Sequence, residues 1–315
     1  MRRLILRNGQ SPGDLLTMTR AVGDLKAAYP DWEIDVESPC AAIWENNPHL
    51  TQLDPTTDGV EIIEVDYGLT ADVSPDGKAS GIHTSGWRGQ HFTSGFHDCL
   101  ERQLGVSVPQ TSLFPELFLS DEERGWINQA RCDLSWDGPF WLINAGCKPD
   151  NELKQYHRWQ EVADEFNARF HGEVRLIQIG HSAHPHPRLT GVWSLVGRTD
   201  LRQLIRLAYW SHGIISPISF PFVLAAALRL AHVVVAGGKE GVRWQMFPHG
   251  RYLHTNGALP CCAWDGCWLG GARGQCKDRT AAGVPRCFDL ITPTMIVDAV
   301  EMYYLGGSLS REATP

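Results

Sequence analysis

The sequence predicts an α/β protein built from two Rossmann-like domains. Both halves open in the same way, with a short apolar strand, a turn that contains glycine, and a helix. In the first half, Leu4–Leu6 leads into Gly13 and Asp14, and in the second Phe140–Asn144 leads into Gly146. A strand that passes through such a turn into a helix is the start of a parallel βαβ unit. The 315 residues also suit two domains better than one core.

The rest of the first half alternates between strand and helix patterns. Apolar residues recur at helical spacing from Leu15 to Ala28, directly after the first turn. The long segment 66–90 is rich in Gly, Ser and Thr, which is typical of a functional or mobile loop. The other elements expected here are strands over 32–36 and 60–65, a helix over 92–104, and a helix that Ser120 and Glu123 cap.

The second half repeats the alternation after a cluster of breaking residues, Asp137-Gly138-Pro139. This cluster predicts a boundary between domains at 1–137 and 138–315. His181, His184 and His186 follow a predicted strand, and the prolines among them favour a plain loop over a metal site. The strands expected are 174–180, 192–196, 213–216 and 232–236, and the helices are 158–170, 200–210, 222–230 and one that Thr292 and Pro293 begin.

A segment rich in cysteine and glycine, residues 261–287, interrupts the α/β pattern near the C-terminus. Its spacing predicts one tetrahedral metal ion, zinc or iron, on Cys262, Cys267, Cys276 and Cys287. Two disulfides or ordinary half-buried thiols are the alternatives, and Cys261 is either a fifth, non-ligating thiol or a replacement for Cys262. Because protein ligands would fill every coordination position, the ion is expected to be structural, and no catalytic metal is predicted.

Composition excludes several classes of protein. The net charge of −8 offers no footprint for nucleic acid. The apolar run at the N-terminus is too short for a signal peptide. Prolines and charged residues interrupt the most apolar region, 214–236, so no transmembrane segment is expected. These features predict a cytoplasmic protein whose cysteines are mostly reduced.

Asp14 lies at the carboxyl end of the first strand, where open α/β sheets bind ligands. From the residues alone, a helix N-cap is the favoured interpretation of this aspartate, because Asp is common at that position.

With these motifs in order, the chain resembles the family 9 glycosyltransferases, the group of ADP-heptose:lipopolysaccharide heptosyltransferases, in a branch that carries a cysteine metal finger. In the first half the resemblance rests on Gly13–Leu16, Tyr29–Pro30 and Asn47–Pro48. In the second half it rests on Asn144–Gly146 with Lys154, Leu195–Leu201, Leu224–Ala227, Ala236–Glu240 and Asp289–Pro293.

The resemblance implies a GT-B type fold in which the N-terminal domain takes the acceptor and the C-terminal domain takes the nucleotide sugar. It implies inverting transfer of heptose or a related sugar from a nucleotide diphosphate, ADP-linked in the family. Asp14 falls on the family's catalytic aspartate, which reverses the preference for a simple cap. Lys154 would contact phosphate and Glu240 the ribose hydroxyls. The complete set of donor-binding residues expected is Gly13, Gly146, Lys154, Ser219, Gly237, Gly238, Lys239 and Glu240.

One stretch departs from the family pattern. The family has an Asp-Ser-Gly-x-x-His type of sequence before the Leu-Ala-Ala-Ala helix, and here Ile218, Phe220 and Val223 replace the acid, the glycine and the histidine. The alternative hypothesis is therefore a catalytically impaired glycosyltransferase-like protein that binds nucleotide or glycan, or serves in assembly. The acceptor is a glycan, a protein or a small molecule, and a homo-oligomer is a possible state.

Overall fold

A computed structural model describes residues 1–67, 90–148, 154–268, 276 and 278–305. The described residues divide into two compact units, the first formed by 1–67 with 90–126 and the second by the residues from 127 onwards. Helix α4 (Gln129–Leu134) already contacts a helix of the second unit, α6 (Leu201–Trp210). The domain boundary expected near Asp137 stays a prediction.

The first unit holds a three-stranded parallel sheet in the order β2-β1-β3. Its strands are β1 (Arg3–Arg7), β2 (Glu33–Glu37) and β3 (Val60–Glu64). The central strand buries Leu4, Ile5 and Leu6, as expected for a strand that neighbours flank on both sides. The helices of this unit are α1 (Pro12–Ala28), α2 (Phe92–Leu104) and the short α3 (Asp121–Gly125), with a 3₁₀ turn η1 at Ala41–Ile43.

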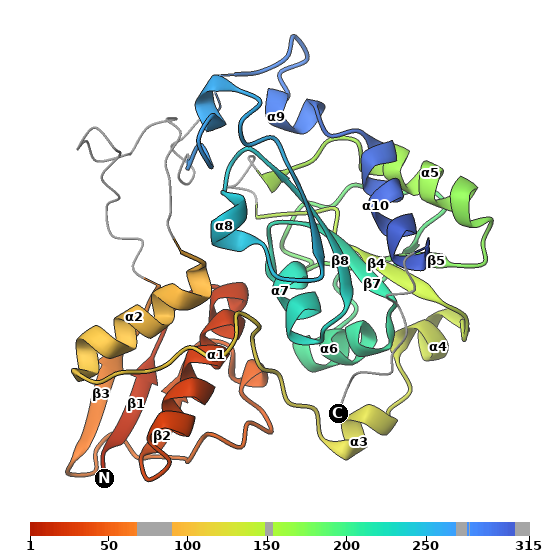
Figure 1. The fold of residues 1–315 in the computed structure, drawn as a ribbon. Coiled ribbons are helices and arrows are strands. Elements are labelled where there is room, and N and C mark those ends of the chain that lie inside the picture. The colour runs from red at the N-terminus through yellow and green to blue at the C-terminus, as the bar shows by residue number, and fades with distance from the viewer. Residues whose placement is uncertain (68–89, 149–153, 269–275, 277, 306–315) are drawn as a thin grey trace. The chain divides into compact units, whose positions relative to one another are not determined.

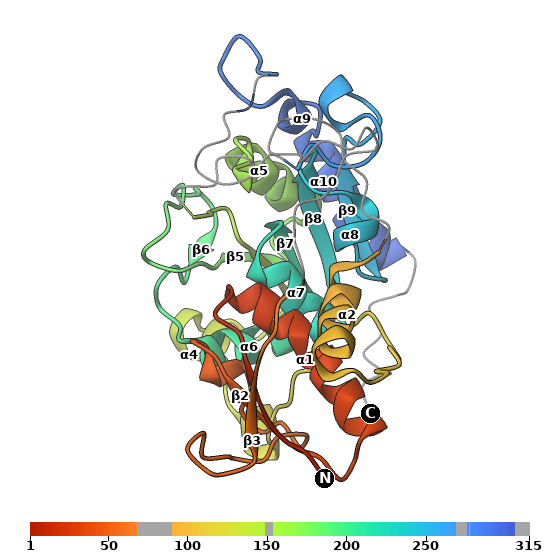
Figure 2. The same ribbon diagram turned by 90° about the vertical axis from the view of Figure 1, so that its left-hand side faces the viewer.

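The second unit holds a six-stranded parallel sheet in the order β6-β5-β4-β7-β8-β9. Figure 2 shows β6 and β9 at its opposite edges. The strands are β4 (Phe140–Ile143), β5 (Arg175–Gln178), β6 (Trp193–Ser194), β7 (Gly213–Pro217), β8 (Ala231–Gly237) and β9 (Gly250–His254). Every residue of β4, β7 and β8 is buried, which is typical of central strands with helices on both faces.

Helices cover both faces of this sheet, so the second unit is doubly wound (Figure 1). On one face α5 (Trp159–Phe170) packs against α10 (Pro293–Leu305). On the other α6 packs against α7 (Phe220–Ala227). Two more short helices, α8 (Val242–Gln245) and α9 (Arg286–Asp289), and a 3₁₀ turn, η3 (Pro260–Cys262), lie near the carboxyl end of β8.

These units confirm the predicted α/β class with two parallel Rossmann-like sheets. No helix of the described residues is long and apolar enough to cross a membrane. Several details differ from the predictions. Strand β9 was missed, because five residues of mixed polarity at a sheet edge carry little pattern. Helix α7 begins at Phe220 rather than Phe222, because Pro221 fits the first turn of a helix. The helix expected after Ser120 is confirmed, because Ser120 and Glu123 form its capping box, and it spans five residues.

Candidate functional site

The carboxyl edge of the six-stranded sheet contains a topological switch point. From β4 the chain proceeds through β5 to β6 on one side, and then returns to β7 and continues through β8 to β9 on the other. The connections on the two sides of β4 and β7 therefore diverge and leave a space above the ends of these strands. Open α/β sheets bind ligands at such a point.

Two loops meet at this switch point. After β4, the side-chain amide of Asn144 donates to Ser219 Oγ at 3.1 Å, and its Oδ1 accepts from the Gly146 N–H at 3.3 Å. Gly146 has no room for a side chain, because an added Cβ would lie 2.3 Å from His186 Nδ1 and 2.5 Å from the Pro185 carbonyl oxygen. The close approach of His186 explains the glycine at this position.

Ser219 is the N-cap of α7, in extended backbone conformation. The first N–H groups of a helix have no intrahelical partner, and together with the helix dipole they favour an anion. Ser219 Oγ also lies 3.3 Å from the Pro217 carbonyl oxygen, to which it can donate. Phe222, in contrast, points into the core and packs against Phe247 with ring centroids 5.8 Å apart. The α7 N-terminus therefore presents backbone groups and Ser219 to the sheet edge.

The next loop, after β8, supplies two charged residues. Gly237 has φ +61°, a left-handed conformation that glycine adopts without strain, and the chain then turns through Gly238 to Lys239 and Glu240. Lys154, in the connection that follows β4, places its ammonium nitrogen 3.0 Å from Glu240 Oε1. The residues expected to bind the donor in the second half thus gather at one sheet edge.

Burial and neighbouring charges have opposite effects on the pKa of Glu240. Burial would raise the pKa of Glu240, but the ammonium groups of Lys154 and Lys239 outweigh it and hold the pKa below its ordinary value. Burial, with the nearby Lys154 charge, lowers the pKa of Lys239 to about 8. Because Glu240 is 9% exposed and paired with Lys154, its expected contact with ribose stays a prediction.

A cavity of about 390 Å³ lies beside Gly146 in the second unit. The loop after β4 forms one wall, the start of α5 another, and the loop after β5 the third. Apolar and aromatic side chains and a smaller number of polar ones line it, as is usual for a small-molecule pocket. The residues that line it are Ala145–Cys147, Gln155–His157, Trp159, Gln160 and Pro185–Leu189.

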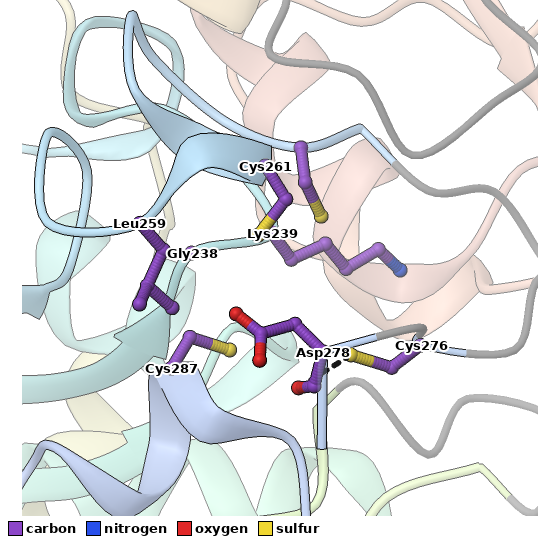
Figure 3. Close-up of a pocket in the computed structure, with 8 residues that line it drawn as sticks. Gly238, Lys239, Leu259, Cys261, Cys276, Asp278 and Cys287 are labelled. Carbon is purple, nitrogen blue, oxygen red and sulfur yellow. Dashed lines mark hydrogen bonds between the residues drawn. The ribbon is translucent and has the colours of Figure 1, made fainter.

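The cysteine segment lies against the turn after β8. Cys267 donates its backbone N–H to the Gly238 carbonyl at 2.8 Å, and Trp268 donates to the Lys239 carbonyl at 2.9 Å. The thiols of Cys261, Cys267, Cys276 and Cys287 line one cavity of about 10 Å³, roughly the space of a single water-sized sphere. Figure 3 shows the side chain of Lys239 extending between Cys261 and Asp278.

The convergence of these cysteines was predicted, and four of them line one cavity, while their coordination of a metal ion stays a prediction. No group of three or more His, Cys, Asp or Glu side chains in the described ranges is arranged to hold an ion. The donor chemistry nevertheless fits a thiophilic metal. Cys262 donates to the Thr255 carbonyl at 3.2 Å, whereas Cys261 lines the cavity, so the alternative that Cys261 replaces Cys262 stays open. Burial and neighbouring thiols raise the pKa of Cys261 to about 12 and that of Cys287 to about 11.

Asp14 lies in the first unit, at the third position of α1. The helix begins at Pro12 with Ser11 as its N-cap, so Asp14 is not the cap itself. Its Oδ2 accepts from the Ser11 N–H at 3.1 Å, as the third residue of a capping box does. Gly13, which was expected to bind the donor, precedes it in the same first turn. The carboxylate is half-buried at the carboxyl end of β1.

Sequence reasoning missed two residues of this edge as site residues, Asn144 and His186. Asn144 was part of the family-like motif, but its bond to Ser219 joins loops 75 residues apart and has no local signature. His186 was assigned to a plain loop. The close fit of its ring against Gly146 and Gly180 is a tertiary contact that spacing does not reveal.

The comparisons with known proteins support the fold. No protein-family model matches the chain, and no curated protein matches it. Among solved structures, it is similar to a family 9 glycosyl transferase from Veillonella parvula, with 13% identity, 97% of both chains covered and a TM-score of 0.64. It is also similar to the E. coli ADP-heptose lps heptosyltransferase II, with 16% identity, 98% of this chain and 100% of that one covered, and a TM-score of 0.62.

A third similar structure is the dodecameric iron-containing heptosyltransferase TibC in complex with ADP-D-beta-D-heptose. It is 15% identical, with a TM-score of 0.68, and the match covers 98% of this chain and 77% of that one. At these identities the similarity establishes the shared GT-B type fold of two Rossmann-like units. The chemistry has to be argued from the residues of this chain.

Proposed function

We propose that this protein is an inverting glycosyltransferase that takes its sugar from a nucleotide diphosphate. The observation that carries the proposal is the meeting of Lys154, Ser219 and the Gly237–Glu240 turn at the switch point of a GT-B type fold. A cation, a helix N-terminus and glycine turns at one sheet edge suit a diphosphate.

The donor is assigned to the second unit. The diphosphate binds at the N-terminus of α7, with Lys154 and Lys239 as cations and Gly146, Gly237 and Gly238 allowing close backbone approach. The nucleoside enters the cavity of about 390 Å³ beside Gly146. Two heptosyltransferases of similar fold have been solved with ADP-D-beta-D-heptose and with ADP, and on that ground ADP-linked heptose is the first donor to test.

Asp14 is assigned the role of general base. Its carboxylate accepts the proton of the acceptor hydroxyl while that oxygen forms a bond to the anomeric carbon. The bond from this carbon to the diphosphate oxygen breaks, and the diphosphate leaves with the electron pair. Lys154 and the α7 N–H groups stabilise the charge that develops on it. The acceptor is a glycan, a protein or a small molecule.

The cysteine segment is assigned a structural metal. Cys267, Cys276 and Cys287, with Cys261 or Cys262, would hold zinc or iron through four thiolates, and the ion would fix the segment against the turn after β8. TibC is described as iron-containing and dodecameric, which makes iron and a homo-oligomer the first possibilities to examine here. Cytoplasmic location remains part of the proposal.

A second candidate function is nucleotide or glycan binding without transfer. It is favoured by Ile218, Phe220 and Val223, which replace the acid, the glycine and the histidine of the family pattern. Ile218 and Val223 are buried in the apolar interior, so neither offers a polar group to a sugar.

Two measurements separate these functions. The first is calorimetric titration of the metal-replete protein with ADP, UDP, GDP and dTDP. Binding of one nucleotide supports a donor site and identifies its base, whereas no binding of any of them contradicts the transferase and leaves glycan binding as the second candidate. The second compares sugar transfer by the wild type and by Asp14→Asn. The variant should keep its nucleotide affinity and lose at least a hundredfold in transfer rate. Retained transfer would refute the role of Asp14.

A further inference from the structure

The Lys154–Glu240 ion pair crosses the end of a strand. Lys154 belongs to the connection after β4 and Glu240 to the turn after β8, and β7 lies between these two strands in the sheet. The N-terminus of α7, with Ser219, follows β7 directly. The pair therefore joins the loops on either side of the proposed diphosphate position.

Glu240 is fixed from several directions. Its carboxylate pairs with Lys154, and the side-chain amide of Gln245 in α8 helps to lower its pKa. Its own carbonyl oxygen accepts from the Tyr252 hydroxyl of β9 at 3.2 Å. A buried acidic residue whose carboxylate is paired and whose backbone carbonyl is held from β9 has little freedom to move.

Lys154 is held less completely. Its side chain is 21% exposed, and Glu240 is the one described residue that its ammonium group contacts. An ammonium group has three N–H donors, so it can contact Glu240 and a ligand at the same time. The four-carbon stem of a lysine loses rotamer entropy when a ligand fixes it, and a partner that already fixes it removes this cost from binding.

We propose that Glu240 is a positioning residue: it holds the ammonium group of Lys154 in front of the α7 N-terminus, where Lys154 contacts the diphosphate of the donor. This inference rests on the proposed donor site and replaces the expected contact between Glu240 and ribose. It predicts that Glu240 acts on the phosphates and only through Lys154.

The first test compares ADP and inorganic pyrophosphate as titrants of Glu240→Gln at one salt concentration. Both should bind about three- to tenfold more weakly than to the wild type, the range expected for fixing one long side chain. Glu240→Asp, which keeps the charge on a shorter stem, should recover part of the loss. If ADP alone weakens and pyrophosphate does not, Glu240 contacts the nucleoside and the proposal is wrong.

The second test is a double-mutant cycle. Lys154→Met should weaken ADP binding more than Glu240→Gln does, and adding Glu240→Gln to it should cause no further loss. Additive losses would overturn the proposal, because they mean that Glu240 acts without Lys154. Glu122→Gln, an exposed carboxylate of the first unit, is the matched control and should bind like the wild type.

Thermal unfolding of each variant checks that an affinity change does not come from unfolding. The Lys154→Met/Glu240→Gln double variant lacks both charges of the ion pair, so no charge is left unpaired in it. Its affinity can therefore be measured even if Lys154→Met alone is destabilised. If the wild type binds no nucleoside diphosphate and no pyrophosphate, the donor site and this inference both fail. If the wild type binds them and Glu240→Gln binds equally well, the inference alone fails.

Discussion

A buried aspartate in the first unit leads to the sharpest stability prediction. Asp24 of α1 is 1% exposed, and its carboxylate is surrounded by donors. Arg20 contacts it at 2.8 Å and His97 Nε2 of α2 at 2.9 Å. Thr111 donates through its hydroxyl at 2.6 Å and its backbone N–H at 3.2 Å. These contacts connect α1, α2 and the segment after α2.

Replacing Asp24 by Asn keeps the volume and removes the charge. The change leaves Arg20 in the interior without one of its two acidic partners, since Glu116 still contacts it at 2.7 Å. Breaking a buried pair costs about 3–5 kcal/mol when the remaining charge is uncompensated. Because Glu116 remains, we expect the lower end, about 3 kcal/mol.

Hydrogen exchange resolved by segment is the suitable assay, because it reports each unit separately. A loss of about 3 kcal/mol corresponds to about a hundredfold faster exchange, since every 1.4 kcal/mol is tenfold. The most protected amides of α1 and α2 should show this change, and those of α5 and α10 should not. Asp98→Asn, which alters the exposed neighbour of His97, is the control and should leave both units unchanged.

The effect should depend on pH with a definite sign. Burial opposes ionisation of Asp24, but the bonds from His97, Thr111 and Arg20 outweigh it, so its pKa in the folded protein lies below the ordinary value. A lowered pKa stabilises the fold above the unfolded value, about 3.9, and that contribution is lost as pH falls through the folded value. The difference between wild type and Asp24→Asn should therefore be full at pH 7 and shrink in acid. Equal exchange at pH 7 would refute the argument.

Two further predictions concern the second unit. Cys261→Ser and Cys262→Ser should differ in metal content, measured by mass spectrometry. The variant that lacks a metal ligand should lose most of its metal, whereas the other variant and the control Cys132→Ser should keep it. Equal retention of metal by all three variants would contradict a four-cysteine centre. Gly146→Ala should lower the midpoint of thermal unfolding, because the added Cβ would lie 2.3 Å from His186. Adding His186→Ala should restore part of this loss. If Gly146→Ala alone is as stable as the wild type, the His186 ring moves freely and the reasoning is wrong.

The parts of the fold that the sequence predicted are those with strong local pattern. The mostly apolar sequences of β7 and β8 and the helical spacing of α1 and α10 are properties of neighbouring residues. Thr292 was expected to cap α10, and its Oγ1 accepts from the Met295 N–H at 3.2 Å. The order of the strands, which creates the switch point, is a long-range property and had to come from the structure.

In the candidate site, too, features with a local sequence pattern were predictable and long-range contacts were not. Glycine turns after β4 and β8 were recognisable because glycine has a specific backbone use. The pairing of Lys154 with Glu240 and the bonds of Asp24 to His97 and Thr111 join residues distant in sequence, and no local pattern distinguishes them from ordinary surface charges. The metal prediction relied on cysteine spacing, which anticipated the convergence of thiols but not their individual orientation.

The contacts of the turn after β8 also determine when, during synthesis, this turn can reach its final structure. Gly238 and Lys239 receive hydrogen bonds from Cys267 and Trp268, and Gly237 packs against Phe288. All three partners leave the ribosome after the turn itself, while domains fold as their residues become available. The first unit can fold on the ribosome well before the second unit acquires its anion-binding edge. A nascent chain that stalls before Phe288 would thus display a folded first unit and an unfinished donor site.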